Sequence, residues 1–395
     1  MTVAPAPAPD GILRPHPTQP GRGEAVLPAP DVQSHAASLT ALPGGDLGCV
    51  WFSGSQEGMA DISVHFSRLP AGSGRWTAPV RLSGDPDRSE QNPVLFPAPD
   101  GGLWLLHTAQ RAGNQDTSEV RLRVSRDGGV TWGPVRSLFP ADDRGGVFVR
   151  QPLVVLGSGR WLLPVFRCPV TPGARWTGGL DTSAVMLSDD QGLTWREHPV
   201  PGSTGRVHMN VHPRPDGTLL ALFRSRTADR VYRSVSQDEG ETWSVPEPTT
   251  APNNNSSLQY VPLGDGRLAM VHNHASAADA TERRTSLYDE IEEDAAGPAP
   301  AAGDDLAFWG APRAPLTLSL STDSGRTWPA RHDLVTGDGH CLTNNSREGL
   351  NRELSYPTLT RTPGGVLHIA YTHHRRTIRH LRLDPEWLDR YLPRP

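Results

Sequence analysis

Arginine and histidine side chains in the middle of the chain have spacings that could bring them together. Arg224 and Arg226 alternate with a serine in LFRSR, and side chains two residues apart lie on the same face of a β-strand. His208, Asn210 and His212 share a face in the same way within RVHMNVHP. A guanidinium group can pair with an anion, and an imidazole titrates near neutral pH. The two histidines leave a metal site open, although their spacing suits a metal best on a helix and this segment looks extended.

A run of uncharged polar residues, APNNNSSLQ at 251–259, is a second candidate for chemistry. Asn and Ser side chains offer hydrogen-bond donors and acceptors without charge, which suits the hydroxyls of a sugar. Consecutive Asn and Ser are also typical of a turn. Both interpretations stay open, with Asn255 as the candidate ligand-binding residue.

The elements that must position these residues are set by an octapeptide, Ser-x-Asp-x-Gly-x-Thr-Trp, which occurs four times. The copies lie at 125–132, 188–195, 236–243 and 321–328. Asp and Ser side chains bond nearby backbone groups in a turn, Gly supplies a positive φ, and Thr-Trp begins the next extended segment. We call this turn the Asp-box. One copy indicates a hairpin turn, whereas four copies indicate a repeated β-unit.

A second repeat, a Gly-containing turn followed by an apolar strand, occurs six times. Four of these strands are followed by an Asp-box, and the first is followed by a degenerate copy at 67–76. The pattern predicts an all-β fold, a six-bladed β-propeller. Residues 275–312, rich in Ala, Asp, Glu and Pro, interrupt the repeat and are expected to form an insertion or long loop at the fifth blade.

Polar residues stand before proline where several of the predicted blades begin, as in QNP, RQP and SYP. By the phase of the repeat they should line the central funnel, where propellers commonly bind ligands. This places Asn92, Arg150 and Gln151 near the candidate site. In HHRR (373–376), which follows the last strand, Arg376 either reaches the funnel or lies in an exposed turn.

Composition and charge limit the remaining possibilities. Residues 1–30 are rich in Pro and Ala and are expected to form a loose N-terminal arm, followed by a single propeller at 31–390. The arm lacks the pattern of a secretory signal, and no apolar stretch has the length of a membrane span, so we expect a cytoplasmic protein without a membrane partner. A net charge of −5 argues against nucleic acid as a partner. The three cysteines show no metal-ligand or disulfide spacing, and we expect no cofactor and no metal.

The Asp-box within a six-fold β repeat resembles the sialidase (neuraminidase) superfamily, from His35 to nearly the end of the chain. The closing segment, ELSYPTLTRTPGGVLHIAYTHHRRTIRHLRLDPEWL at 353–388, looks most like the branch of predicted bacterial neuraminidases whose activity is poorly defined. The resemblance implies a sialidase-like propeller and a carbohydrate substrate.

Sialidases hold the substrate carboxylate with three arginines, because guanidinium groups pair bidentately with a planar anion. The second arginine is matched by Arg226, with Arg224 as its neighbour, and the third by Arg313 in APRAPLTLSL. At the position of the first arginine the sequence has His35, in SHAASLTALPGGDL. The resemblance therefore carries over the second and third arginines of the clamp, whereas His35 stands in place of the first.

The nucleophile of sialidases is a tyrosine, which Tyr356 matches in ELSYPT. The glutamate that activates this tyrosine in the family has no counterpart here. The corresponding segment, RVHMNVHPRPDG, offers His208 and His212, and His208 is the candidate base for Tyr356. The family's acid is an aspartate in the loop after the first strand. The corresponding loop, SGSQEGMADIS, offers Glu57 and Asp61.

Three classes of function follow from these residues. The leading hypothesis is an exo-acting glycoside hydrolase on a glycan that contains an acidic sugar, with sialic acid itself left open. The second is a lyase that abstracts the proton next to a uronate carboxylate through a His/Tyr pair. The third is a glycan-binding propeller without catalysis. Ultraviolet absorbance of the products separates a lyase from a hydrolase, and binding without turnover indicates the third class.

Overall fold

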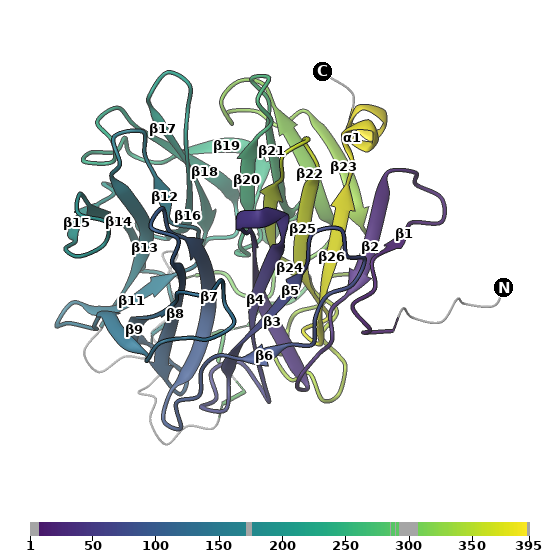
Figure 1. The fold of residues 1–395 in the computed structure, drawn as a ribbon. Helices are drawn as coiled ribbons and strands as arrows, with labels where there is room; N and C mark the ends of the chain where they lie inside the picture. Colours follow the sequence, from purple (N-terminus) through teal and green to yellow (C-terminus); the bar gives the residue numbers. More distant parts are fainter. Residues whose placement is uncertain (1–7, 171–175, 285, 289, 292–306, 393–395) are drawn as a thin grey trace.

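The computed structural model describes residues 8–170, 176–284, 286–288, 290–291 and 307–392. Its strands form six antiparallel sheets arranged in a ring, which confirms the predicted six-bladed β-propeller (Figure 1). The described residues contain no helix with the length and hydropathy that a membrane span requires.

The strands of the first three blades are consecutive in the chain. The first blade contains β3 (Gln33–Ala41), β4 (Leu47–Gly54), β5 (Ser63–Leu69) and β6 (Val80–Arg81). The second contains β7 (Ser89–Pro97), β8 (Leu103–Arg111), β9 (Asn114–Ser125) and β10 (Arg136–Phe139). The third contains β11 (Gly145–Val149), β12 (Val154–Val155), β13 (Trp161–Pro169), β14 (Thr182–Ser188) and β15 (Arg196–Pro199).

The last three blades complete the ring. The fourth contains β16 (Arg206–Pro213), β17 (Leu219–Ser225), β18 (Arg230–Ser236) and β19 (Glu247–Pro252). The fifth contains β20 (Gln259–Pro262), β21 (Leu268–Asn273), β22 (Leu316–Ser321) and β23 (Ala330–Val335). The sixth contains β24 (Leu354–Arg361), β25 (Leu367–His373), β26 (Thr377–Leu383), β2 (Arg22–Val26) and β1 (Arg14–Pro15). The short helices are η1 (Pro43–Gly45), η2 (Ala277–Asp279) and α1 (Pro385–Tyr391).

The hydrophobic core lies between neighbouring blades. One cluster joins Val50 and Val64 of the first blade to Leu95 and Leu105 of the second, and comparable clusters fill the other gaps between blades. Both faces of each blade are therefore covered. This explains why β4 and β17 are buried along their whole length, whereas a sheet with one wet face would alternate buried and exposed residues.

The four Asp-box turns share one hydrogen-bond pattern. In the first, Asp127 Oδ1 accepts from the backbone N–H of Thr131 at 2.8 Å and from Ser125 Oγ at 2.7 Å. The Thr131 hydroxyl donates to Asp127 Oδ2, and these bonds lower the pKa of Asp127 to about 2. The indole of Trp132 donates to the carbonyl of Gly129 at 3.2 Å. Each of these turns connects the last two strands of its blade, β9–β10, β14–β15, β18–β19 and β22–β23.

The N-terminal segment closes the ring, so the expectation of a loose arm over residues 1–30 is wrong for its described part. β2 pairs with β26 over five residues and forms the outer part of the sixth blade, where Figure 1 shows the two strands side by side. Gly11 then accepts from the backbone N–H of Trp76 at 3.0 Å, which ties this segment to the first blade. A ring of sheets needs a partner for its last edge, and residues 22–26 supply it. Residues 1–7 lie outside the described part of the chain.

The expected insertion lies between β21 and β22, and residues 285, 289 and 292–306 of it lie outside the described residues. Its described residues contact several blades. The Tyr288 hydroxyl accepts from Gln110 and Gln115 of the second blade, at 3.0 and 2.8 Å. The Trp309 indole donates to the carbonyl of Thr177 at 3.0 Å, and the backbone N–H of Phe308 donates to the carbonyl of Arg226 at 2.7 Å. The insertion thus connects the fifth blade to the second, third and fourth.

A chain of buried aromatic nitrogens crosses the closing seam and predicts acid sensitivity. Trp76 Nε1 donates to His380 Nδ1 at 3.2 Å, so the His380 proton is on Nε2, which donates to His368 Nδ1 at 3.0 Å. Burial lowers the pKa of His368 to about 4 and, with the nearby His368, holds that of His380 well below its usual value. As pH falls, His368 and His380 therefore take up protons at a higher pH in the unfolded chain than in the folded protein. The stability that the neutral pair provides is complete above pH 6.5 and is lost as pH falls through about 4.

We expect the free energy of unfolding to fall by about 1.4 kcal/mol per pH unit for each proton taken up. Urea denaturation at several pH values between 7 and 4 measures this slope. His380→Gln keeps a donor and an acceptor but cannot titrate, so its slope should be shallower, whereas His340→Gln in a loop outside the seam serves as the control. Equal slopes for the His380 variant and the natural protein would contradict the assignment.

Candidate functional site

The innermost strands share a backbone feature at the end where they begin. Ala36, Asn92, His208, Asn255 and Tyr356 all have positive φ values, between 48° and 56°. Four of them coincide with register shifts in the pairing of the innermost strand with its neighbour, and Asn255 precedes β20. A bulge of this kind re-aims side chains and is costly for residues other than glycine. Each of these blades therefore turns a residue away from the regular alternation near the ring's axis.

Tyr356 lies at the centre of a group of arginines. Its hydroxyl accepts from Arg224 Nη1 at 2.6 Å. The Cζ atoms of Arg150, Arg224 and Arg313 lie 5.2, 5.5 and 5.5 Å from the centre of its ring. The tyrosine is 6% exposed and the ring of His35 lies 4.4 Å from its own, centre to centre. Residues from the first, third, fourth and fifth blades thus meet at the tyrosine of the sixth.

The surrounding charges change the acidity of Tyr356. Burial alone disfavours the phenolate, but the positive charges of Arg224 and Arg313 outweigh burial and lower the pKa of Tyr356 below its usual value. Burial also lowers the pKa of Arg224 to about 9, which leaves it charged at neutral pH. The arrangement favours the anionic form of the phenol, the form that a nucleophile requires.

A buried carboxylate, Glu353, organises the other arginines, although it was not among the predicted site residues. Arg313 Nη1 donates to both of its oxygens, at 3.3 and 3.2 Å, and Arg375 Nε lies 3.2 Å from Oε2. Ser355 Oγ donates to Oε1 at 2.5 Å. Burial opposes ionisation, but the charges of Arg375 and Arg313 hold the pKa of Glu353 well below its usual value. The sequence feature that could have identified Glu353 as a site residue is its position three residues before Tyr356, in ELSYPT.

Arg375 is the second residue that the sequence did not single out. Its Nη1 donates to Glu57 Oε2 at 2.5 Å, and its Nη2 lies 3.4 Å from His35 Nε2. It is 1% exposed, whereas the predicted Arg376 is exposed. The two arginines are adjacent in the β25–β26 turn, and only the backbone path of that turn decides which one faces inward. A guanidinium therefore lies beside His35, at the position where the resemblance had placed an arginine.

Arg224 differs from these arginines because no carboxylate contacts it among the described residues. Its Nε donates to Asn255 Oδ1 at 2.7 Å, and its Nη1 also lies 3.5 Å from His208 Nε2. Its buried Nη2 atom has no hydrogen-bond partner in the described part of the chain. Burial, and next the charge of Arg224, hold the pKa of His208 well below its usual value, so the imidazole is neutral and adds no charge beside the guanidinium. An anion would satisfy this guanidinium.

Arg226 lies in a different environment from Arg224. Its Nε and Nη2 atoms donate to Asp181 Oδ2 at 3.0 and 2.5 Å, and Trp176 Nε1 donates to Asp181 Oδ1 at 2.9 Å. Arg226 and Asp181 are 2% and 0% exposed. The guanidinium also lies 5.2 Å from the ring centre of Trp309. The charge of Arg226 is therefore neutralised by a buried ion pair, and of the two arginines in LFRSR it is Arg224 that reaches Tyr356.

Several predicted residues tie blades together. Arg150 donates to the carbonyls of Ala37 and Tyr356 at 3.0 and 3.1 Å, so its side chain bridges the first and sixth blades. Gln151 accepts a hydrogen bond from the Gln259 side chain and donates one to the Leu258 carbonyl. Asn210 accepts one from the backbone N–H of Tyr260.

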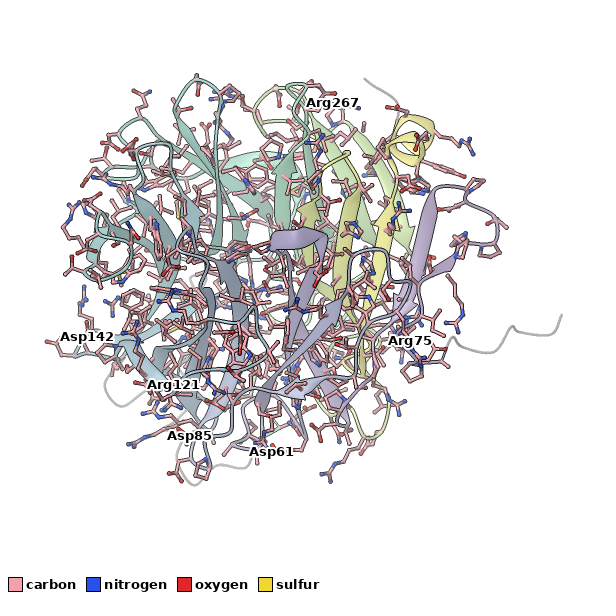
Figure 2. All side chains as sticks on the ribbon, in the orientation of Figure 1. Asp61, Arg75, Asp85, Arg121, Asp142 and Arg267 are labelled. Atoms are coloured by element: carbon pink, nitrogen blue, oxygen red, sulfur yellow. The ribbon has the colours of Figure 1, made fainter. Side chains whose placement is uncertain are left out.

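The remaining predicted residues lie at different depths. Asn92 is buried at the bulge of β7, and His35 is fully buried with its pKa held well below the usual value by burial and then by Arg375. Glu57 is buried against Arg375, whereas Asp61 is exposed and accepts from the backbone and hydroxyl of Ser55, both at 2.9 Å. Figure 2 shows Asp61 at the lower edge of the ring. Of the two carboxyl groups in this loop, only Glu57 touches the cluster.

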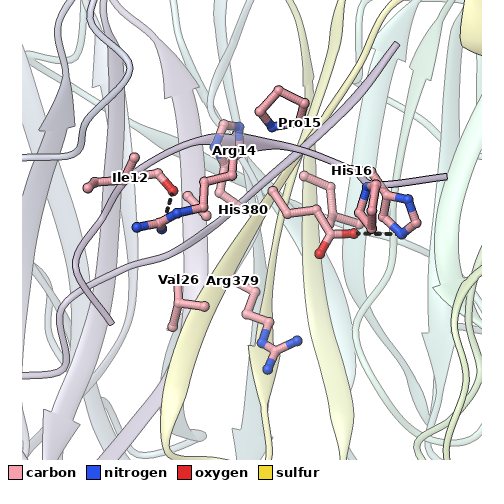
Figure 3. Close-up of a pocket in the computed structure, with 11 residues that line it drawn as sticks. Ile12, Arg14, Pro15, His16, Val26, Arg379 and His380 are labelled. Atoms are coloured by element: carbon pink, nitrogen blue, oxygen red, sulfur yellow. Dashed lines mark hydrogen bonds and ion pairs between the residues drawn. The ribbon is translucent and has the colours of Figure 1, made fainter. Parts of the chain in front are cut away.

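The described residues contain no group of three or more His, Cys, Asp or Glu side chains that could hold a metal ion. A cavity of about 190 Å³ lies beside the β1–β2 hairpin, where Ile12, Arg14, His16 and Arg379 line it (Figure 3). It shares no lining residue with the cluster around Tyr356.

The ring of six sheets, its Asp-box turns and the buried tyrosine among arginines define a sialidase-like β-propeller. A family model described as BNR repeat-like domain matches residues 45–369, and the chain belongs to this family. No curated protein matches the chain.

Solved structures with this fold are similar at low identity. The Hadza microbial sialidase Hz136 aligns with a TM-score of 0.64 and 15% identity over 90% of this chain and 66% of its own, so the chain spans slightly less than two thirds of that sialidase. The NanB sialidase from Streptococcus pneumoniae aligns with a TM-score of 0.66 and 11% identity over 96% and 71%. A protein of unknown function from Dyadobacter fermentans aligns with a TM-score of 0.65 and 15% identity over 92% and 99%. These similarities confirm the fold that the sequence resemblance implied.

Proposed function

We propose that this protein is an exo-acting glycoside hydrolase of sialidase type that cleaves a terminal sugar carrying an anionic group. The observation that carries the proposal is the 2.6 Å contact between Arg224 and the Tyr356 hydroxyl inside a group of guanidiniums. A buried phenol with a lowered pKa suits nucleophilic attack, and a guanidinium with an unpartnered Nη2 suits an anionic substrate group.

In the proposed reaction, the oxygen of Tyr356 forms a bond to the anomeric carbon of the substrate. The bond from that carbon to the departing oxygen breaks, and Glu57 gives its proton to that oxygen. Water then attacks the anomeric carbon, Glu57 takes up the proton that the water releases, and Tyr356 leaves as the phenolate. Arg224 and Arg313, whose guanidiniums lie close to the tyrosine ring, hold the anionic group of the sugar together with Arg375, which lies beside His35.

Two features of the cluster support these assignments. His208 has a pKa well below its usual value, which makes it a poor proton acceptor, so we assign the ionisation of Tyr356 to the arginines. Arg375 lies beside His35, the residue that stands at the sequence position of the family's first arginine, and Glu353 and Glu57 hold it there. The clamp that we propose is therefore Arg224, Arg313 and Arg375, with Arg226 outside it.

The test is incubation of the protein with a panel of sialylated and uronate-containing oligosaccharides, followed by mass spectrometry and ultraviolet absorbance of the products. Release of a terminal acidic sugar without absorbance supports the proposal. Products with the absorbance of a conjugated double bond would point to a lyase, for which the neighbouring rings of His35 and Tyr356 offer the residues. Binding without turnover across the panel would indicate a glycan-binding propeller.

The proton donor makes its own prediction. Glu57→Gln should lower kcat by about a hundred- to ten-thousand-fold on a natural glycoside, because the leaving oxygen then departs without a proton. The loss should shrink on a nitrophenyl glycoside, whose leaving group needs no protonation. Asp61→Asn is the matched control and should change kcat little, because Asp61 holds the exposed Ser55 turn. Equal losses of the Glu57 variant on both substrates would instead assign Glu57 to the placement of Arg375.

A further inference from the structure

The side chain of Asn255 joins two parts of the molecule. Its Oδ1 accepts from Arg224 Nε at 2.7 Å, and its Nδ2 donates to the carbonyl of Phe308 at 2.9 Å. The orientation of the amide is unambiguous, because a guanidinium only donates and a carbonyl only accepts. Asn255 is 1% exposed, has a φ of 56°, and donates its own N–H to Asn253 Oδ1 at 3.1 Å. Each end of the amide thus has a hydrogen-bond partner inside the protein.

Arg224 depends on this amide for its direction. Its guanidinium lies between two rings, with Cζ 5.5 Å from the centre of Tyr356 and 5.7 Å from that of Trp309. Ring faces attract the charge without fixing the direction of the N–H groups. A carboxylate at position 255 would also bind Arg224, but it would cancel the charge that acts on Tyr356. An amide orients the guanidinium and leaves its charge in place.

The other partner of Asn255 belongs to the insertion in the fifth blade. The backbone N–H of Phe308 donates to the carbonyl of Arg226 at 2.7 Å, and Trp309 Nε1 donates to the carbonyl of Thr177 at 3.0 Å. These bonds fix residues 308–309 on the third and fourth blades. A continuous set of contacts therefore runs from the insertion through Asn255 and Arg224 to the Tyr356 hydroxyl.

We propose that Asn255 is a positioning residue, which couples the fifth-blade insertion to Arg224 and so holds Arg224 against Tyr356. In this proposal its role is to orient Arg224 rather than to bind sugar hydroxyls, since each end of its amide already bonds to a group of the protein. The part of the inference that concerns catalysis rests on the proposed glycoside hydrolase function, whereas the coupling itself is a property of the folded protein.

The test compares variants at two adjacent asparagines. Asn255→Gly removes both hydrogen bonds and keeps the positive φ without strain. Asn255→Asp tolerates the same backbone and places a carboxylate against Arg224. Asn254→Ala is the control, because Asn254 Nδ2 donates to the carbonyl of Pro312 in the same insertion at 2.7 Å, whereas the side-chain partner of Arg224 Nε is Asn255. The readout is the pKa of Tyr356, taken from ultraviolet titration of the phenols after subtraction of the same titration in Tyr356→Phe.

We expect both Asn255 variants to raise the pKa of Tyr356 by about one unit or more, and kcat to fall more than KM changes. The Asn254 variant should titrate like the natural protein. A Tyr356 pKa that stays unchanged in both Asn255 variants, or that rises equally in the Asn254 variant, would overturn the proposal. Because the titration needs no turnover, it tests the coupling even where no substrate is cleaved, and a glycan panel without turnover would count against the proposed function alone.

Discussion

Tyr356→Phe is expected to lower kcat by about a thousand-fold or more on any glycoside that the natural protein cleaves. The substitution removes one oxygen, which is the atom that Arg224 Nη1 contacts at 2.6 Å, and it keeps the ring that packs 4.4 Å from His35. The fold should therefore remain intact while the proposed nucleophile is lost. Steady-state kinetics with the best substrate of the panel measures the effect.

The control for this substitution is Tyr232→Phe. Tyr232 also loses a hydrogen-bonded hydroxyl, which donates to Asp229 Oδ2 at 2.8 Å, but its position on β18 lies outside the cluster. Its kcat should match that of the natural protein. Turnover by Tyr356→Phe within a few-fold of the natural level would remove the tyrosine from the reaction, and with it the proposed mechanism.

Comparison of the natural protein with Tyr356→Phe also isolates the titration of Tyr356. The neighbouring arginines outweigh burial and lower the pKa of this phenol, so its ionisation should begin at a lower pH than that of an ordinary tyrosine with a pKa of 10. As pH rises through that lowered value, the phenolate absorbance of the natural protein should exceed that of Tyr356→Phe. A difference spectrum that emerges only above pH 10 would show that burial, and not the arginine charges, determines the pKa.

The largest effect on stability is expected at the buried ion pair of Asp181 and Arg226. Asp181→Ala leaves a guanidinium at 2% exposure without its carboxylate and removes the acceptor of the Trp176 indole. Removal of one partner from a buried pair costs about 3–5 kcal/mol, because the other charge stays buried and uncompensated. Denaturation in guanidinium chloride, followed by tryptophan fluorescence, measures the free energy of unfolding.

An exposed ion pair provides the comparison for Asp181. Asp100 and Arg126 approach to 2.6 Å, as closely as a strong buried pair, but both are solvent-exposed. Asp100→Ala should therefore cost less than about 1 kcal/mol. A double variant, Asp181→Leu with Arg226→Met, should recover much of the loss, since it removes both charges from the interior. A loss below 1 kcal/mol in Asp181→Ala alone would mean that water or another group reaches Arg226.

The amino-acid sequence by itself determined the architecture, because the fold could be predicted from local sequence patterns that repeat along the chain. Each Asp-box is held by hydrogen bonds within a few residues, as Asp127 bonds with Ser125 and Thr131. The four Asp-boxes, together with the six copies of the turn and apolar strand, predict the number and phase of the blades. Tyr356 and Arg313 were likewise found from the segments that contain them. Those segments resemble sialidases, and both residues lie in the cluster.

Only the tertiary structure decided which charges meet. The sequence pattern placed Arg224 and Arg226 on one strand face, but β17 ends at Ser225, and Arg226 lies just beyond it. The carboxylate that neutralises Arg226 comes from another blade, in the loop that carries Asp181. Arg375 and Arg376 are adjacent in the chain, and nothing in the sequence pattern distinguishes them. The backbone of the turn directs Arg375 towards Glu57, which is 318 residues away in the chain. Likewise, residues 22–26 appeared to be part of a loose arm because their partner strand, β26, lies at the other end of the sequence. The pairing of distant segments and the neutralisation of buried charges depend on the closed ring. They therefore cannot be predicted from local patterns in the sequence.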